Sequence, residues 1–185
     1  MGHKIKHMTK KTGFVIKFLQ IVAWFIFVGL CIETGALVVN FVYSLFNPLV
    51  LKNLYNKLDL SAMYEQSQFV FFLIYSFILS ISILKAFLFY EVIKLISKLD
   101  LQKPFSVFVS NQISRIRTVT FTIGLLSIIA TKVVHNFSEK GFDVNQLNEY
   151  WTDGKAFILM SAVLIIIATI FKRGIELQSE NDLTV

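Results

Sequence analysis

Four long apolar runs occupy most of this 185-residue chain, at residues 18–43, 69–93, 118–135 and 156–171. A helix rises about 1.5 Å per residue and the hydrocarbon layer of a bilayer is about 30 Å thick, so a spanning helix needs about 20 mostly apolar residues. Tyr150 and Trp151 precede the fourth run, and since such rings favour the headgroup level we expect this span to cover 150–171. The runs predict an all-α polytopic membrane protein, a bundle of four transmembrane helices.

The composition agrees with lipid as the main surroundings of this chain. Hydrophobic residues make up 55% and charged residues 16% of it, whereas a typical soluble domain has about 25% charged residues. No stretch outside the runs is long enough to build its own core, so we expect one domain over residues 1–185, with a basic leader at 1–17 and a tail at 172–185. The single cysteine, Cys31, excludes a disulfide framework and a thiolate metal site.

The Lys and Arg residues outside the runs predict the orientation, because cytoplasmic loops keep an excess of positive charge. The leader, the loop after the second run and the tail hold five, five and two of them, and the other two loops hold two each. We therefore expect a multi-pass protein of the cytoplasmic membrane, with both termini and the middle loop in the cytoplasm.

The net charge of +6 has two explanations, membrane topology with anionic lipid contacts or binding of nucleic acid. The cations cluster beside the apolar runs, and no motif of basic and aromatic residues accompanies them. We therefore expect anionic lipids as partners and no direct contact with nucleic acid.

The two longer loops carry helical patterns. In the outer loop at 44–68, Leu51, Leu54 and Leu58 recur at helical spacing, which is typical of a short helix that caps the bundle and also of a lid over a ligand. In the middle loop, Lys103 and Pro104 suit a helix start. The residues that follow form a mainly apolar stripe of Phe105, Phe108, Val109, Gln112, Ile113 and Ile116.

Arg115 and Arg117 close this stripe just before the third run. The pattern predicts an amphipathic cytoplasmic helix between the second and third transmembrane helices, with its basic end at the lipid phosphates. A helix that docks a protein partner has the same pattern, so lipid anchoring and partner binding both stay open.

The charged residues Glu33, Lys85 and Lys132 lie inside apolar runs, where a charge costs at least about 2.5 kcal/mol. Glu33 lies about 22 Å and Lys132 about 21 Å from the inner edge of the membrane, since both runs lead outward from about residues 18 and 118. The similar depth and the opposite charge predict an intramembrane ion pair between them. Lys85 lies about 12 Å from the inner end of its run, from where its long side chain can reach the headgroups.

Small and polar residues form a stripe on two of the runs. The stripes are Gly29, Glu33, Ala36 and Asn40 on the first run, and Thr120, Gly124, Ser127 and Thr131 on the third. Such stripes serve contacts within one bundle or between the protomers of a homo-oligomer. The predicted pair either sets the helix register or belongs to an ion pathway, and the count of one embedded acid favours the structural role.

Signals of catalysis are weak throughout the chain. His3 and His7 have no carboxylate or cysteine nearby to complete a metal site, and His135 stands alone at the end of the third run. No motif of a hydrolase, a metalloprotease or a nucleotide-binding enzyme occurs. We therefore expect a protein that is not an enzyme and that has no cofactor and no metal.

The tail and the middle loop carry a resemblance to a known family. The chain ends in IFKRGIELQSENDLTV, and the middle loop contains LQKPFS at residues 101–106, followed by Arg115 and Arg117. With the four spans, these segments resemble the bacterial family of domain of unknown function 2975 over nearly the whole chain. The resemblance implies a cytoplasmic-membrane protein with no established activity. Because genes of this family often neighbour one for a small helix-turn-helix regulator, it also implies such a regulator as a partner.

Three functions are consistent with these patterns. The first is a membrane protein that modulates or tethers a helix-turn-helix regulator, the second is an immunity or envelope-stress protein against membrane-active peptides, and the third is a small transporter. The surface for a partner or for lipid would consist of Phe105, Phe108, Ile113, Arg115, Arg117, Glu176, Glu180 and Asp182. The alternative for the tail is that it packs under the bundle and seals it.

Overall fold

The structure, a computed structural model, describes residues 2–55, 58–100 and 105–183, and the described residues form helices joined by short loops. The elements are α1 (Gly2–Phe46), η1 (Pro48–Lys52), α2 (Ser61–Gln66), α3 (Gln68–Ser97), α4 (Val107–Glu139), η3 (Asn145–Tyr150) and α5 (Gly154–Leu183). Four of these helices are long and apolar enough to cross a membrane, which confirms the predicted all-α membrane bundle. From Gly2 onward, the basic leader is helical and continues into the first span within α1.

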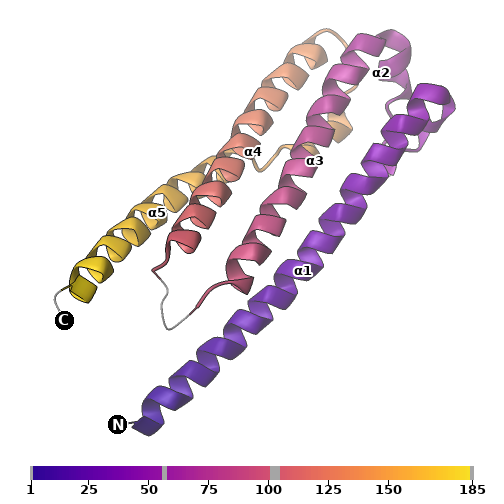
Figure 1. Cartoon of the computed structure of the whole chain (residues 1–185). Helices are drawn as coiled ribbons and strands as arrows, with labels where there is room; N and C mark the ends of the chain where they lie inside the picture. The colour runs from indigo at the N-terminus through magenta and orange to yellow at the C-terminus, as the bar shows by residue number, and fades with distance from the viewer. Residues whose placement is uncertain (1, 56–57, 101–104, 184–185) are drawn as a thin grey trace.

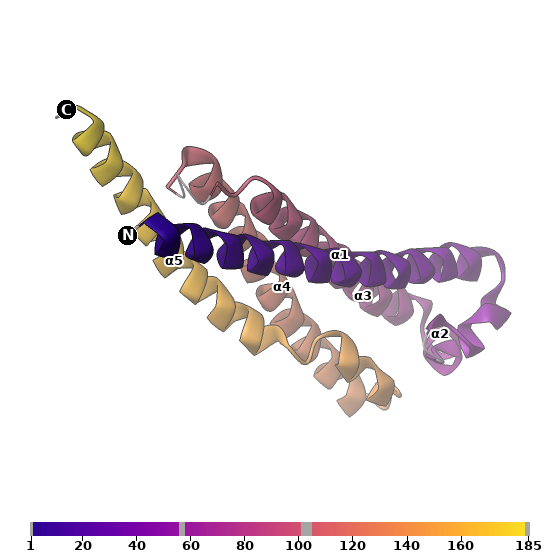
Figure 2. The same ribbon diagram turned by 90° about the horizontal axis from the view of Figure 1, so that it is seen from below.

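The four long helices lie side by side in chain order, with α3 between α1 and α4, and α4 between α3 and α5 (Figure 1). Consecutive long helices run in opposite directions, so both termini lie at the same end of the molecule, which we call the terminal end. α5 crosses the row obliquely and diverges from α1 when the molecule is seen from below (Figure 2). Each outer helix therefore has one protein neighbour and leaves its other faces open.

Aromatic side chains hold α1 against α3. The Phe41 ring stacks on the Tyr75 ring with centroids 5.1 Å apart. The Phe71 ring also packs against the Tyr75 ring, with centroids 5.4 Å apart. The Tyr75 hydroxyl is buried and donates a hydrogen bond of 3.0 Å to the Leu37 carbonyl. A backbone carbonyl has two lone pairs, so the Leu37 oxygen can accept this bond in addition to the bond within its own helix. The bond helps to fix the register of α1 on α3.

The outer loop caps this end of the bundle. Pro48 occupies the first turn of η1, where its missing N–H costs nothing, and Asn47 caps the turn through its side chain. Leu49 is exposed, but five other apolar residues of the loop are buried in the core, namely Leu51, Leu54, Leu58, Leu60 and Met63. The leucine pattern of the sequence is therefore the inner face of a cap.

The predicted amphipathic helix is continuous with the third span, because nothing interrupts α4 from Val107 to Glu139. Ser106 caps this helix by accepting a hydrogen bond of 3.3 Å from the Val109 N–H. The proposed start at Lys103 and Pro104 lies outside the described residues. The apolar stripe faces protein, since Val109, Gln112, Ile113 and Ile116 are all buried.

The chain turns back sharply after α4. Gly141 has a φ of 84°, which a residue with a side chain rarely adopts, and the following loop and η3 run back along α4. α5 then begins at Gly154, beside Ser127, because a Cβ atom on Gly154 would lie only 2.8 Å from the Ser127 Cβ. Ser127 lies twelve residues before the end of α4, so α5 starts about 18 Å along it from that end.

Trp151 does not anchor the fourth span at the headgroups as the sequence suggested. It is only 3% exposed and belongs to the core formed between the loops and α3. The reason is the returning loop, which carries Trp151 inward before α5 starts.

Candidate functional site

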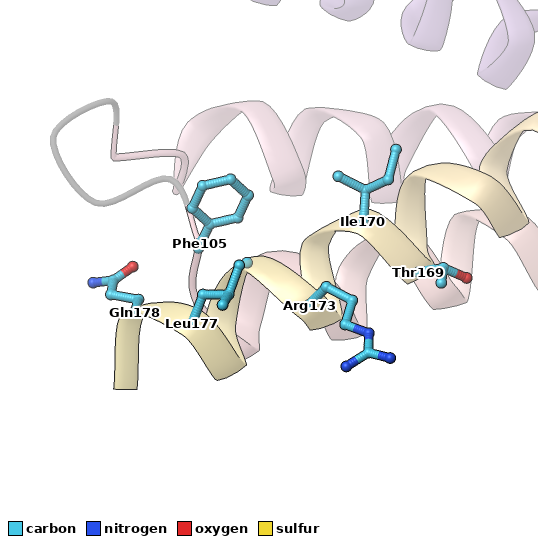
Figure 3. Close-up of a pocket in the computed structure, with 7 residues that line it drawn as sticks. Phe105, Thr169, Ile170, Arg173, Leu177 and Gln178 are labelled. Atoms are coloured by element: carbon cyan, nitrogen blue, oxygen red, sulfur yellow. The ribbon is translucent and has the colours of Figure 1, made fainter. Parts of the chain in front are cut away.

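A groove opens at the terminal end of the molecule, between the start of the α4 region and the last turns of α5. It has a volume of about 600 Å³ and is mainly apolar. We call it the α5 groove, and its lining residues are Phe105, Thr169, Ile170, Arg173, Gly174, Leu177 and Gln178. Figure 3 shows the Phe105 ring above α5. The side chains of Ile170 and Leu177 point to the same side of α5 as the ring, and the Arg173 guanidinium points to the opposite side.

Gly174 allows Phe105 to lie directly on α5. A Cβ atom at this position would come within 2.4 Å of the Phe105 ring, so a residue with a side chain would displace the ring. The ring also contacts Phe171 one turn earlier, with centroids 5.3 Å apart. These two contacts join the middle loop to the tail, two segments that the sequence analysis assigned to one surface.

Charged residues lie at the edge of the α5 groove. Arg173 forms an ion pair of 3.4 Å with Glu176, and both side chains are largely exposed. An exposed pair of this kind is worth at most about 1 kcal/mol. Glu180 is exposed one turn further along, and Asp182 lies in the last turn of α5.

The remaining residues of the predicted surface do not all belong to it. Phe108 is half-buried and lies under the Lys98 ammonium, which is 5.1 Å from the ring centroid. Ile113 is 5% exposed and therefore lies inside the helix contacts, a correction that follows from the packing of the α4 stripe against protein. Arg115 and Arg117 line a separate hollow of about 430 Å³ with Phe87 of α3.

The structure does not join Glu33 to Lys132. Neither residue belongs to the contacts of opposite charge seen between Arg173 and Glu176 or, when the histidine is protonated, between His135 and Glu139. Lys132 is exposed on α4, whereas Glu33 lies on α1, and these two helices are separated by α3.

Glu33 instead belongs to a group of polar side chains around η3. The Tyr150 phenol lies within electrostatic range of the Glu33 carboxylate and of the Tyr55 hydroxyl. Lys85 donates a hydrogen bond of 3.5 Å to the Tyr150 carbonyl, so its ammonium reaches the returning loop and not the inner headgroups. Sequence reasoning missed this group because nothing in the sequence shows that η3 folds back to the level of Lys85.

Sequence reasoning also missed a buried acid. Glu91 is 2% exposed, and its carboxyl group and backbone carbonyl both accept hydrogen bonds from the side-chain amide of Gln112 on α4. Two signals were available, since Glu91 lies inside the second apolar run and Gln112 lies on the apolar stripe of the middle loop. The chain therefore embeds two acids and not one.

The α5 groove and most of the four-helix row lie within a region that matches a known family. Residues 54–185, more than two thirds of the chain, match the family described as protein of unknown function (DUF2975). No curated protein and no solved structure matches the chain. The match covers both the middle loop and the tail that carried the resemblance. The chain therefore belongs to the DUF2975 family of proteins of unknown function.

Proposed function

We propose that this protein is not an enzyme and that it tethers a cytoplasmic helix-turn-helix regulator to the membrane through the α5 groove. The observation that carries the proposal is the groove itself, an apolar hollow of about 600 Å³ at the terminal end. There α5 continues beyond Lys172 to Leu183, about 16 Å further. The distribution of Lys and Arg predicts that this end faces the cytoplasm, where a soluble partner can reach it.

The chemistry of the groove suits an amphipathic helix of a basic protein. Such a helix binds by placing its apolar face in a hydrophobic groove, here against Phe105, Ile170 and Leu177. A DNA-binding regulator is basic because it neutralises phosphates. Beyond Arg173, which lines the groove and pairs with Glu176, the exposed carboxylates of Glu176 and Glu180 on α5 are available to interact with that charge.

The cap at the opposite end favours this function over the binding of membrane-active peptides by the outer loops. The leucines of its helical pattern, Leu51, Leu54 and Leu58, are buried in the core and offer a peptide no apolar stripe, although Leu49 is exposed. In the α5 groove, the exposed Leu177 lies beside other apolar residues that together form a hollow.

Site-specific photocrosslinking in native membranes tests the proposal. A photoreactive amino acid would replace Leu177 in the groove or, as a control, Val163, an exposed residue on α5 outside the groove. We expect the probe at position 177 to capture a soluble helix-turn-helix protein, identified by mass spectrometry, and the probe at 163 to capture lipid. Capture of only lipid or of this same chain at position 177 would contradict the proposal.

A second variant tests whether the shape of the groove matters. Gly174→Leu places a side chain where Phe105 now lies and should abolish capture from position 177. Gly29→Leu is the matched control, because a Cβ atom at Gly29 meets no atom within 4 Å. Equal capture in both variants would show that the groove does not hold the partner.

A further inference from the structure

A second cavity lies far from the α5 groove, where α5 begins beside α4. Its volume is about 440 Å³. Two lysines line it, Lys132 on α4 and Lys155 in the first turn of α5. The other lining residues are Ile128, Thr131, Asn148, Trp151, Thr152 and Gly154.

The charges in this cavity are unbalanced. Both Lys132 and Lys155 are positive, and the lining contains no carboxylate. Lys132 also lies within a membrane-spanning helix, where an uncompensated charge is costly and requires a counter-charge. Glu33 does not supply one, and the neighbouring carboxylates of Glu149 and Asp153 do not line the cavity, so an anion from outside the chain can balance the two lysines there.

The start of α5 adds to the attraction for an anion. Lys155 lies in the first turn of a 30-residue helix, whose macrodipole and first N–H groups favour negative charge, and the Gly154 N–H already donates to the Trp151 carbonyl. Trp151, in the wall of the cavity, has a buried indole N–H that lacks an acceptor among the described residues. Thr131 and Thr152 use their hydroxyl protons on backbone carbonyls, so both oxygens can accept but not donate, and the lysines and the helix amides are the main donors.

Apolar residues continue from the two lysines along the lipid-facing surface. Leu159 follows Lys155 by one helical turn, and Ile129 precedes Lys132 by one turn, so each lies on the same face as its lysine. Both side chains are exposed, Leu159 by 68%. The combination of a cationic cavity with apolar tracks fits an amphiphile and not a free anion.

We propose that this cavity binds the phosphate group of an anionic phospholipid in the leaflet away from the termini. Lys132 and Lys155 hold the phosphate near the positive end of the α5 macrodipole, and the acyl chains lie along Ile129 and Leu159. The site is independent of the α5 groove and of any regulator.

Quenching of Trp151 fluorescence by brominated lipids tests this proposal in the full-length protein. The chain has two tryptophans, so Trp24→Phe leaves Trp151 at the cavity wall as the only reporter. The protein would be reconstituted in vesicles of phosphatidylcholine with either brominated phosphatidylglycerol or brominated phosphatidylcholine at equal content. We expect phosphatidylglycerol to bind in preference, by roughly fivefold for each lysine at the site.

The matched variants separate this site from general attraction to anionic lipid. In the variant that combines Lys132→Gln with Lys155→Gln, phosphatidylglycerol and phosphatidylcholine should bind equally, so that the ratio of their affinities is one. Lys52→Gln combined with Lys140→Gln removes the same charge from exposed lysines outside the cavity and should preserve the preference. The proposal is overturned by equal quenching from both lipids in the reference protein, or by an unchanged preference in the Lys132 and Lys155 variant.

Inorganic phosphate distinguishes a lipid site from a site for a free anion. If the acyl chains contribute as proposed, millimolar phosphate leaves the quenching by phosphatidylglycerol unchanged. Loss of quenching at that concentration would show that a free anion occupies the cavity, which contradicts the lipid assignment.

Discussion

Gln112 on α4 donates hydrogen bonds from one side-chain amide to both the carboxyl group and the backbone carbonyl of Glu91 on α3, the latter at 3.0 Å. Both residues are 2% exposed, so water does not reach this pair. A buried carboxyl group depends on its hydrogen-bond partners more than an exposed one does, because the protein interior solvates it poorly. At the contact between α3 and α4, the buried Glu91 carboxyl group therefore depends on the side-chain amide of Gln112.

Removing that amide should destabilise the protein. Gln112→Leu leaves the Glu91 carboxyl group buried without its donor, which costs about 1–3 kcal/mol. For a chain of this size, each kcal/mol lowers Tm by roughly 2–4 °C. Thermal unfolding in detergent, followed by circular dichroism, measures the loss. Because removal of both partners by apolar groups is nearly neutral, Gln112→Leu with Glu91→Leu should recover most of it, and a double variant less stable than Gln112→Leu would contradict the pairing.

The hydroxyl of Tyr75 offers a second test of the packing, on the contact between α1 and α3. Tyr75→Phe keeps the stack on Phe41 and removes the buried bond to the Leu37 carbonyl, so we expect a loss of about 0.5–1.5 kcal/mol. Tyr43→Phe is the control, since Tyr43 is exposed on α1 and its loss should leave Tm unchanged. Equal effects in the same unfolding assay would show that the bond does not hold α1.

Two glycines should respond oppositely to the same substitution. Gly154→Ala forces a Cβ atom to within 2.8 Å of the Ser127 Cβ and should push α5 away from α4, with a loss of about 1–3 kcal/mol. Gly29→Ala meets open space and gains the better helix propensity of alanine, so its stability should stay equal or rise by up to about 1 kcal/mol. Unfolding of both variants in one detergent gives the comparison, and a Gly154→Ala protein as stable as Gly29→Ala would refute this close approach.

The sequence was sufficient to predict the spans, because length and hydropathy decide whether a helix can cross a bilayer. The apolar stripe of the middle loop was expected to face lipid or a partner, but Ile113 and Ile116 of this stripe are buried within the chain. The helical spacing of apolar residues is the same for a face that contacts lipid and for one that contacts protein. The sequence therefore did not show which of the two covers the stripe. The structure shows that protein covers it, and that α4 is one continuous helix from Val107 to Glu139.

The tertiary pairings were harder to predict, because depth along a span does not determine which helices are neighbours. Glu33 and Lys132 have similar depths from the sequence, but α3 lies between their helices. The small-residue stripe of Gly124 and Ser127 did mark a close contact, and its partner turned out to be the start of α5. The corresponding Gly29 on α1 meets nothing within 4 Å, so the two similar stripes have different surroundings.

The outer cap should loosen in acid through Asp59. Its carboxylate accepts hydrogen bonds from the Ser61 hydroxyl at 2.7 Å and the Ser61 N–H at 2.9 Å, and these bonds hold its pKa below the usual value of 3.8. The pKa of Asp59 is lower in the folded than in the unfolded protein. The stabilisation by its carboxylate is therefore complete above the unfolded-state pKa and is lost as the pH falls through the folded-state pKa. Asp59 is largely exposed, so the effect is local fraying of α2 and not global unfolding. Hydrogen exchange of residues 58–66, compared below and above pH 4 after correction for intrinsic rates, should show loss of protection in acid, and Asp59→Asn should remove that pH dependence. Protection that is independent of pH in the unaltered protein would show that Asp59 does not hold the start of α2.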